Sequence, residues 1–170
     1  MKKLLLPFFL AGSLLMIYVM MKTGATLKTP ATPLGILDLE FAYNDLKAVA
    51  VINAWAASGN IAAAEINTYW DFVFLFFYSF FLFLACKQIA ASLKGTVAKA
   101  GNLVAKAALL AGFLDILENA GMLYTLNGTV SDSIAFLTAF FSVIKWILAI
   151  IAVLYVLTGA LVLGYRKFMT

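Results

Sequence analysis

The sequence predicts an all-α membrane protein: a four-transmembrane-helix bundle with an extracytoplasmic helical cap between spans one and two. Of 170 residues, 65% are hydrophobic and only 12% are charged, and the mean hydropathy is +1.02. Four runs approach or exceed the ~20 mostly apolar residues that cross a hydrocarbon core of ~30 Å. The basic residues gather at the ends of these runs that the topology would bring to one side of the membrane. Together these three observations predict the fold class.

Composition also excludes several classes of protein and of site. Soluble domains are nearer half apolar and a quarter charged, so we expect neither a soluble nor a disordered protein. We expect no nucleic-acid binding, despite a pI of about 9.2. Histidine is absent and there is one cysteine, so we expect no haem, no His-based zinc site and no disulfide within the chain. The length fits one integral membrane domain, residues 1–170.

The predicted spans are the four apolar runs at residues 4–21, 71–91, 103–126 and 134–165. The last run is longer than one crossing needs, so we expect it to tilt or to project from the bilayer. Lys2 and Lys3 before the first run also suit a signal peptide. We expect a retained helix, because the run is long for such a peptide and no small-residue cleavage site follows it. The phenylalanines of the second run are expected to face lipid.

The distribution of charge predicts the orientation. Eight basic residues lie before span one, around the connection of spans two and three, and after span four: Lys2, Lys3, Lys87, Lys94, Lys99, Lys106, Arg166 and Lys167. All eight acidic residues lie elsewhere in the chain. Because basic residues mark the cytoplasmic side, we expect both termini in the cytoplasm and residues 22–70 outside.

The outer segment, residues 22–70, predicts a helical cap. Asn44 suits the N-cap of a helix that ends near Ala57. A Ser-Gly-Asn turn then precedes a helix that begins near Ile61 and runs into span two. Residues 34–41 belong to this cap or re-enter the bilayer, which requires that protein bury their backbone. Three aromatic residues suit the interfacial belt of a membrane protein, namely Trp55, Tyr69 and Trp70.

Span three carries ionisable residues in the middle of an apolar run. Asp115, Glu118 and Asn119 share one helix face, because they are spaced three and four residues apart. A carboxylate at this depth is costly unless it is protonated, paired or hydrated, and it marks a candidate functional site. Spans three and four run antiparallel across a short loop. If the two ends of this loop lie at equal depth, Asp115 lies level with Lys145, and Glu118 with Ser142.

We therefore predict a cluster of Asp115 and Glu118 with Lys145, in a polar pocket among spans two, three and four that opens toward the outer half. Asn119 and Ser142 are predicted binding residues of the same cluster. Asp71 at the outer end of span two, Tyr78 seven residues further on, and Glu40 or Asp38 from the cap complete it. In the alternative interpretation, the network only fixes helix register, with Lys145 reaching outward.

Several short motifs resemble a family of small bacterial four-span integral membrane proteins with a D-x-x-E-N motif in the third span. The motifs are Leu39-Glu40-Phe41-Ala42, Trp55, Trp70-Asp71-Phe72-Val73-Phe74, Asp115-Ile116-Leu117-Glu118-Asn119 and a lysine, Lys145, in the last span. The resemblance covers nearly the whole chain. It implies a bacterial inner membrane and one constellation of Glu40, Asp71, Asp115, Glu118, Asn119 and Lys145, but no activity.

Three functions fit this constellation. In the first, the site binds or processes a lipid-like amphiphile from the outer leaflet, with Asp115 and Glu118 as catalytic acid and base, since paired carboxylates in a low dielectric can hold different protonation states. Such an oxygen-rich site also suits Mg²⁺ or Ca²⁺. The second is a small proton- or cation-coupled transporter or channel, which with four helices needs a homo-oligomer. The third is a structural or assembly subunit. Membrane lipids are the expected partners.

Overall fold

A computed structural model describes residues 2–169, with the side chains of residues 2, 3, 167 and 168 outside the described part. No strand occurs among residues 2–169, so the all-α prediction is confirmed. The elements are α1 (Lys2–Thr23), the 3-10 turn η1 (Ala25–Leu27), α2 (Ile36–Glu40), α3 (Asp45–Ala57), α4 (Ile61–Ser92), α5 (Gly95–Leu126) and α6 (Asp132–Met169).

Four of these helices are long and apolar enough to cross a membrane: Leu4–Thr23, Ile61–Ser92, Gly95–Leu126 and Asp132–Arg166. Each contains one of the predicted spans. In their most apolar stretches, only 17% of residues in α1 and 11% in α6 are buried, against 33% in α4 and in α5. So much exposed apolar surface is unfavourable in water and suits contact with lipid.

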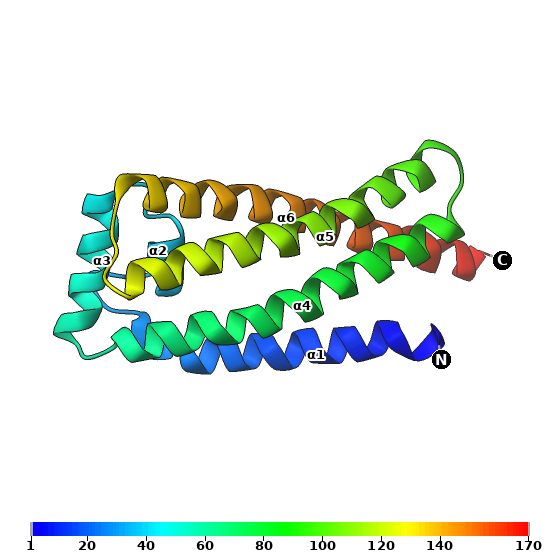
Figure 1. Ribbon diagram of the computed structural model, residues 1–170. Coiled ribbons are helices and arrows are strands. Elements are labelled where there is room, and N and C mark those ends of the chain that lie inside the picture. The colour runs from blue at the N-terminus through cyan, green and yellow to red at the C-terminus, as the bar shows by residue number, and fades with distance from the viewer. Residues whose placement is uncertain (1, 170) are drawn as a thin grey trace.

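Both termini lie at the same end of the bundle as the α4–α5 connection (Figure 1). Three of the lysines behind the orientation prediction, Lys2, Lys3 and Lys167, have side chains outside the described residues. The opposite end, called the cap end below, holds α2, α3 and the α5–α6 connection (Figure 1). Helix α3 crosses this end of the bundle.

Helix α4 is the central helix, because it packs against α1, α5 and α6, while α5 and α6 also pack on each other. Helix α1 is held on α4 by aromatic rings, with Phe9 against Phe76, Phe77 and Phe80. Gly12 of α1 faces the Phe77 ring, which fills the space that a side chain at Gly12 would need. The expectation that these phenylalanines face lipid is therefore wrong for Phe77, whereas Phe76 and Phe80 pack on Phe9 and still remain 47% and 37% exposed.

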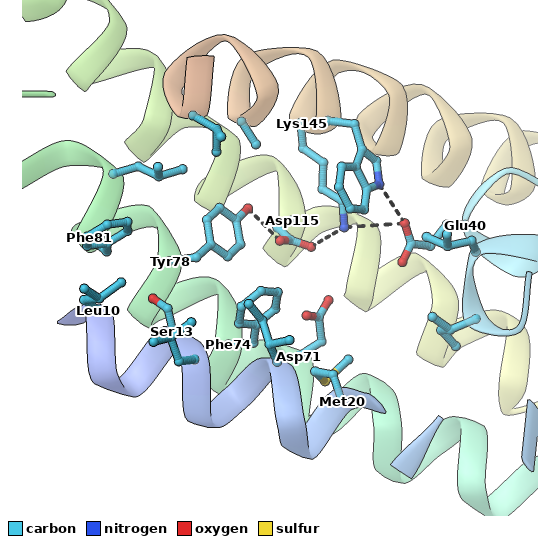
Figure 2. A pocket seen from close by; sticks show the side chains of 18 residues that line it. Leu10, Ser13, Met20, Glu40, Asp71, Phe74, Tyr78, Phe81, Asp115 and Lys145 are labelled. Atoms are coloured by element: carbon cyan, nitrogen blue, oxygen red, sulfur yellow. Dashed lines mark hydrogen bonds and ion pairs between the residues drawn. The ribbon is translucent and has the colours of Figure 1, made fainter. Parts of the chain in front are cut away.

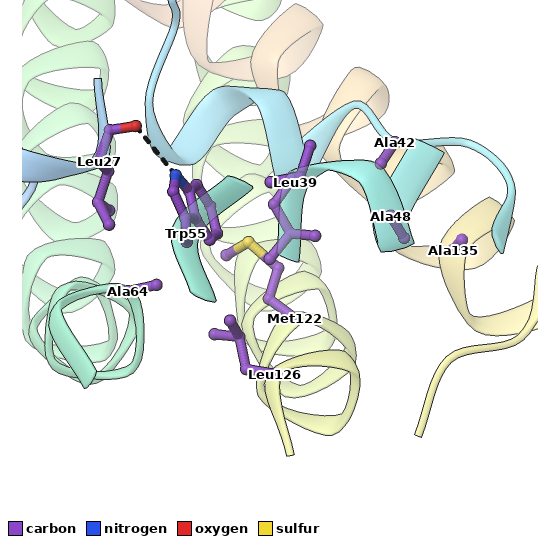
Figure 3. Close-up of a cluster of buried hydrophobic side chains, with 10 residues drawn as sticks. Leu27, Leu39, Ala42, Ala48, Trp55, Ala64, Met122, Leu126 and Ala135 are labelled. Atoms are coloured by element: carbon purple, nitrogen blue, oxygen red, sulfur yellow. Dashed lines mark hydrogen bonds between the residues drawn. The ribbon is translucent and has the colours of Figure 1, made fainter. Parts of the chain in front are cut away.

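The cap packs on the ends of α4, α5 and α6 through one hydrophobic cluster, in which Trp55 contacts the group that includes Met122 and Leu126 (Figure 3). The Trp55 side chain is fully buried, and its indole N–H donates to the Leu27 carbonyl at 3.0 Å and to Thr32 Oγ1 at 3.2 Å. The prediction of an interfacial position is wrong for Trp55, because the cap supplies acceptors for its N–H group. Tyr69 and Trp70 are exposed.

The predicted cap helix is present as α3, and the predicted unbroken helix from Ile61 into span two is present as α4. Asn44 is the N-cap of α3, since its Oδ1 accepts from the Lys47 amide at 2.9 Å. Asp132 Oδ1 accepts from the Asp45 amide at 3.0 Å, which ties α3 to the start of α6. The cap is thereby fixed to the bundle.

The short helix α2 directs the chain from the cap into the bundle. It begins after Gly35, whose φ of 67° lies in the left-handed region that favours glycine. It ends at Glu40, which is 4% exposed and hydrogen-bonds to Ser142 and Trp146. Ser142 and Trp146 lie ten and fourteen residues into α6, about 15 and 21 Å from its start. Residues 36–40 therefore reach well below the cap end.

Candidate functional site

Lys145 of α6 is the centre of a buried cluster of acids. Its Nζ donates to Asp115 Oδ1 at 2.7 Å and to Glu118 Oε1 at 2.9 Å, and lies 3.7 Å from Glu40 Oε2. The predicted contact of Asp115 and Glu118 with Lys145 is confirmed. Two carboxylates one turn apart on α5 and a third from α2 thus surround one ammonium group (Figure 2 shows Asp115, Glu40 and Lys145).

Helix α4 adds two further groups to this cluster. The Tyr78 hydroxyl donates to Asp115 Oδ2 at 2.7 Å, so both oxygens of Asp115 accept a hydrogen bond. Asp71 Oδ2 accepts from the Asn119 side-chain amide at 3.0 Å. Tyr78 and Asp71 are two turns apart on α4, and both face α5. The structure therefore connects α4 to the cluster at two levels.

Glu40 enters from the cap, and α6 holds it. The Ser142 hydroxyl donates to Glu40 Oε2 at 3.2 Å, and the Trp146 indole N–H donates to the same oxygen at 3.1 Å. Ser142, which was expected level with Glu118, thus binds Glu40, because α2 brings that carboxylate beside α6. Asp38, the other cap residue considered, does not reach the cluster, since its Oδ2 accepts from the Leu34 amide at 2.8 Å.

The cluster has more acidic groups than basic ones, and it is almost wholly buried. Glu40, Asp71, Asp115, Glu118, Asn119, Ser142 and Lys145 are between 0% and 6% exposed. Four carboxyl groups face one ammonium group, so the fully ionised cluster has three negative charges in excess. Glu118 Oε2 and Asn119 Oδ1 are buried without a hydrogen-bond partner in the described chain. Burial of unbalanced charge is costly, so protons or a cationic group must offset part of this excess.

A cavity of about 390 Å³ borders the cluster. Glu40, Asp71, Asp115 and Lys145 line its charged part, whereas Glu118 does not line it. The remaining wall is almost wholly apolar and includes Leu10 and Ile17 of α1, Phe81 and Leu82 of α4, and Ala149 and Val153 of α6. Val153 lies eight residues beyond Lys145 along α6. The cavity therefore extends about 12 Å from its charged part toward the end of the bundle that holds both termini, called the terminal end below.

The predicted walls of this pocket need correction. The expectation was a pocket among spans two, three and four, but the cavity lies between α1, α4 and α6 beneath α2 (Figure 2). Helix α5 contributes Asp115 to the lining and otherwise packs on α4 and α6. Helix α1 packs on α4 and closes one side of the cavity. Nothing in the sequence assigns that side to α1.

The geometry gives no support for a metal centre. Within the described residues, no group of three or more His, Cys, Asp or Glu side chains is arranged to hold a metal ion. Asp115 and Glu118 each give an oxygen to Lys145, whose positive charge occupies the position between them. The arrangement suits cation and proton binding by carboxylates around a fixed ammonium group.

Sequence reasoning missed Trp146 and the residues of α1 that line the cavity. Trp146 follows Lys145 directly, and a residue with an N–H donor deep in a span is a signal that was available. The lining residues of α1 carry no comparable signal, because aliphatic side chains at helical spacing are equally suited to lipid. Six of the eight predicted site residues are joined by hydrogen bonds and ion pairs around Lys145. The other two, Asp71 and Asn119, form a hydrogen-bonded pair, and Asp71 lines the same cavity as Lys145.

The chain matches no protein-family model, no curated protein and no solved structure. The resemblance to four-span bacterial membrane proteins therefore stays a prediction. The case for a function rests on the geometry of the cavity and the cluster beside it.

Proposed function

We propose that this protein binds a single-chain amphiphile from the outer leaflet of a bacterial inner membrane. Its polar head would lie against Glu40, Asp71 and Asp115, and its chain would lie in the apolar part of the cavity. The observation that carries the proposal is one cavity with a charged part and a long apolar part. Ligand sites are typically concave, mostly apolar and equipped with a few polar groups, with volumes of about 300–1,000 Å³.

The ligand enters sideways, between α1 and α6. Five residues of the cavity wall are themselves exposed on the surface, among them Leu14 at 59% and Ile17 at 43% in α1 and Trp146 at 41% in α6. An amphiphile in the membrane can reach such an opening without leaving the bilayer. The basic residues around the α4–α5 connection favour a cytoplasmic position for the end of the bundle that holds both termini. The charged part of the cavity then faces the outer half of the membrane.

Photolabelling with a diazirine-bearing long-chain alcohol tests this proposal on protein in phosphatidylcholine nanodiscs. Lipid touches α1 and α6 in any case, so the diagnostic site is α4 around Leu82, which is 5% exposed and lines the cavity. We expect saturable labelling there that excess dodecanol suppresses. The variant Ala149→Phe puts a ring into the cavity and should reduce labelling at Leu82 about tenfold, by displacing the chain.

Ala160→Phe is the matched control, because Ala160 is exposed on the same helix and lies outside the cavity lining. It should label like the unmodified protein. Thermal unfolding of both variants checks that they fold. Unsaturable labelling at Leu82, or equal labelling in Ala149→Phe and the unmodified protein, would contradict the proposal.

A proton- or cation-coupled transport function is the second candidate, favoured by the excess of carboxyl groups around Lys145. It predicts an acid-sensitive flux in proteoliposomes that Asp115→Asn abolishes and Ala149→Phe leaves intact. If Ala149→Phe blocks the flux, the result would instead indicate that the amphiphile is the species that moves through the cavity.

A further inference from the structure

The ammonium group and most of the polar donors of the cluster already contact its own acids. Lys145 has three N–H donors, and its Nζ lies within 4.0 Å of three carboxylates. The Tyr78 hydroxyl donates to Asp115, and the Trp146 indole N–H donates to Glu40. An anionic head such as a phosphate would meet these acids and find no free positive charge. An anion is therefore disfavoured.

Acceptors, in contrast, are left over on the cavity wall. Glu40 uses Oε2 for its three contacts, and Asp71 uses Oδ2 for Asn119. The second oxygens of these two side chains accept no hydrogen bond from the described residues, although Glu40 is 4% and Asp71 6% exposed. Both residues line the cavity, and the Asp71 carboxylate points across it toward Lys145 and Asp115 (Figure 2).

We infer that the cavity selects an amphiphile with a cationic, hydrogen-bond-donating head, an amine on a single apolar chain. This inference rests on the proposed function and names its ligand class. An ammonium head supplies donors to the free oxygens of Glu40 and Asp71 and offsets part of the negative charge. The apolar wall toward Leu82 and Val153 takes the chain. Charge complementarity of this kind gives specificity by penalising the wrong sign.

Competition against the photolabelling alcohol tests the inference with three compounds of equal chain length: dodecylamine, dodecanol and dodecyl phosphate. The readout is labelling at Leu82 in nanodiscs near neutral pH, where the amine is protonated. We expect dodecylamine to compete at concentrations about tenfold below those of dodecyl phosphate. Because the compounds partition differently into lipid, the decisive comparison is between protein variants for each compound.

Asp71→Asn removes one charge and keeps the size of the side chain. We expect it to weaken competition by dodecylamine about tenfold and to leave dodecanol within about twofold. Glu40→Gln, which keeps acceptors for Ser142 and Trp146, should act in the same direction and serves if Asp71→Asn fails to fold. Lys99→Gln is the matched control, since Lys99 is exposed at the terminal end and outside the cavity lining.

Two results overturn the inference, and they are distinguishable. If dodecanol competes at Leu82 but dodecylamine shows no loss in Asp71→Asn and Glu40→Gln, or dodecyl phosphate competes best, the head class is wrong and amphiphile binding stands. If none of the three compounds suppresses labelling at Leu82, amphiphile binding fails and the head class fails with it.

Discussion

Lys145 determines whether this cluster of acids can be buried. Its ammonium group contacts carboxylates from α2 and α5, and its own helix, α6, supplies the Ser142 and Trp146 donors to one of them. Removing one partner of a buried ion pair leaves an uncompensated charge, which costs more than the pair itself gains. A single residue thus couples three elements that are distant in sequence.

Lys145→Met should destabilise the protein by about 3–5 kcal/mol near neutral pH, because three buried carboxylates lose their cation. The measurement is thermal unfolding in nanodiscs. The deficit should shrink as the pH falls, since protonation neutralises the same carboxylates without the lysine. Stability equal to that of the unmodified protein, or a deficit that grows in acid, would contradict this assignment.

Two further variants separate charge from packing. Lys99→Met removes an exposed lysine of α5 and should change stability by less than about 0.5 kcal/mol. Combining Lys145→Met with Asp115→Asn and Glu118→Gln removes two of the three carboxylate charges that lose their cation and should recover a large part of the loss. Failure of this combination to recover stability would mean that shape, rather than charge, dominates.

At the scale of elements, α1 is a wall of the cavity that is attached along one side. It packs on α4 through Phe9 and through the close approach at Gly12, and at its end Asn67 of α4 donates to Thr23 Oγ1 at 2.6 Å. Its lining residues Leu14 and Ile17 remain exposed. The position of α1 therefore sets the width of the lateral opening.

Gly12→Leu should push α1 away from α4, because the new side chain would overlap the Phe77 ring. Overpacking of this kind costs about 1–3 kcal/mol. The measurements are thermal unfolding and photolabelling of α4 at Leu82, for which we expect lower stability and weaker saturable labelling. Gly164→Leu is the control, since nothing lies within 4 Å of a Cβ at that position. Equal behaviour of the two variants would mean that the α1–α4 contact does not shape the cavity.

At the scale of the whole molecule, the bundle is polarised along its axis. The termini and the lysine-rich α4–α5 connection lie at one end, and the cap and the charged part of the cavity lie toward the other (Figure 1). Residues 36–40 descend from the cap into the bundle, and Glu40 reaches the level of Lys145. Surrounding protein buries Leu39 and Glu40, whereas Leu34 and Phe41 at the two ends of the segment are exposed.

The orientation is testable with one cysteine on each end. Cys86 is buried, so Cys86→Ala provides a background without thiols. In intact bacterial cells, a membrane-impermeant maleimide should label Ser58→Cys in the cap and not Lys94→Cys at the α4–α5 connection, because basic residues stay in the cytoplasm. After cell lysis both should be labelled. The reverse pattern in intact cells would invert the topology and put the cavity in the inner leaflet.

The sequence alone determined the four spans, the cap helix and the ion pair of Asp115 with Lys145. Each of these follows from local information: apolar run length, an N-cap residue, and the depth relation across one short antiparallel connection. Hydrophobic periodicity and charge are properties of a segment itself, so no distant partner is needed to recognise them. The same relation places Ser142 level with Glu118, but it does not show that α2 brings Glu40 to the Ser142 hydroxyl.

Only the tertiary structure decided which helices enclose the cavity and what reaches the cluster. Glu40 meets Trp146 across 106 positions of sequence, and Trp55 meets the Leu27 carbonyl across 28. Apolar side chains suit lipid and protein equally, so composition says nothing about which face of α1 meets α4. That choice depends on shape, on Gly12 accepting the Phe77 ring, and shape exists only once the helices are packed.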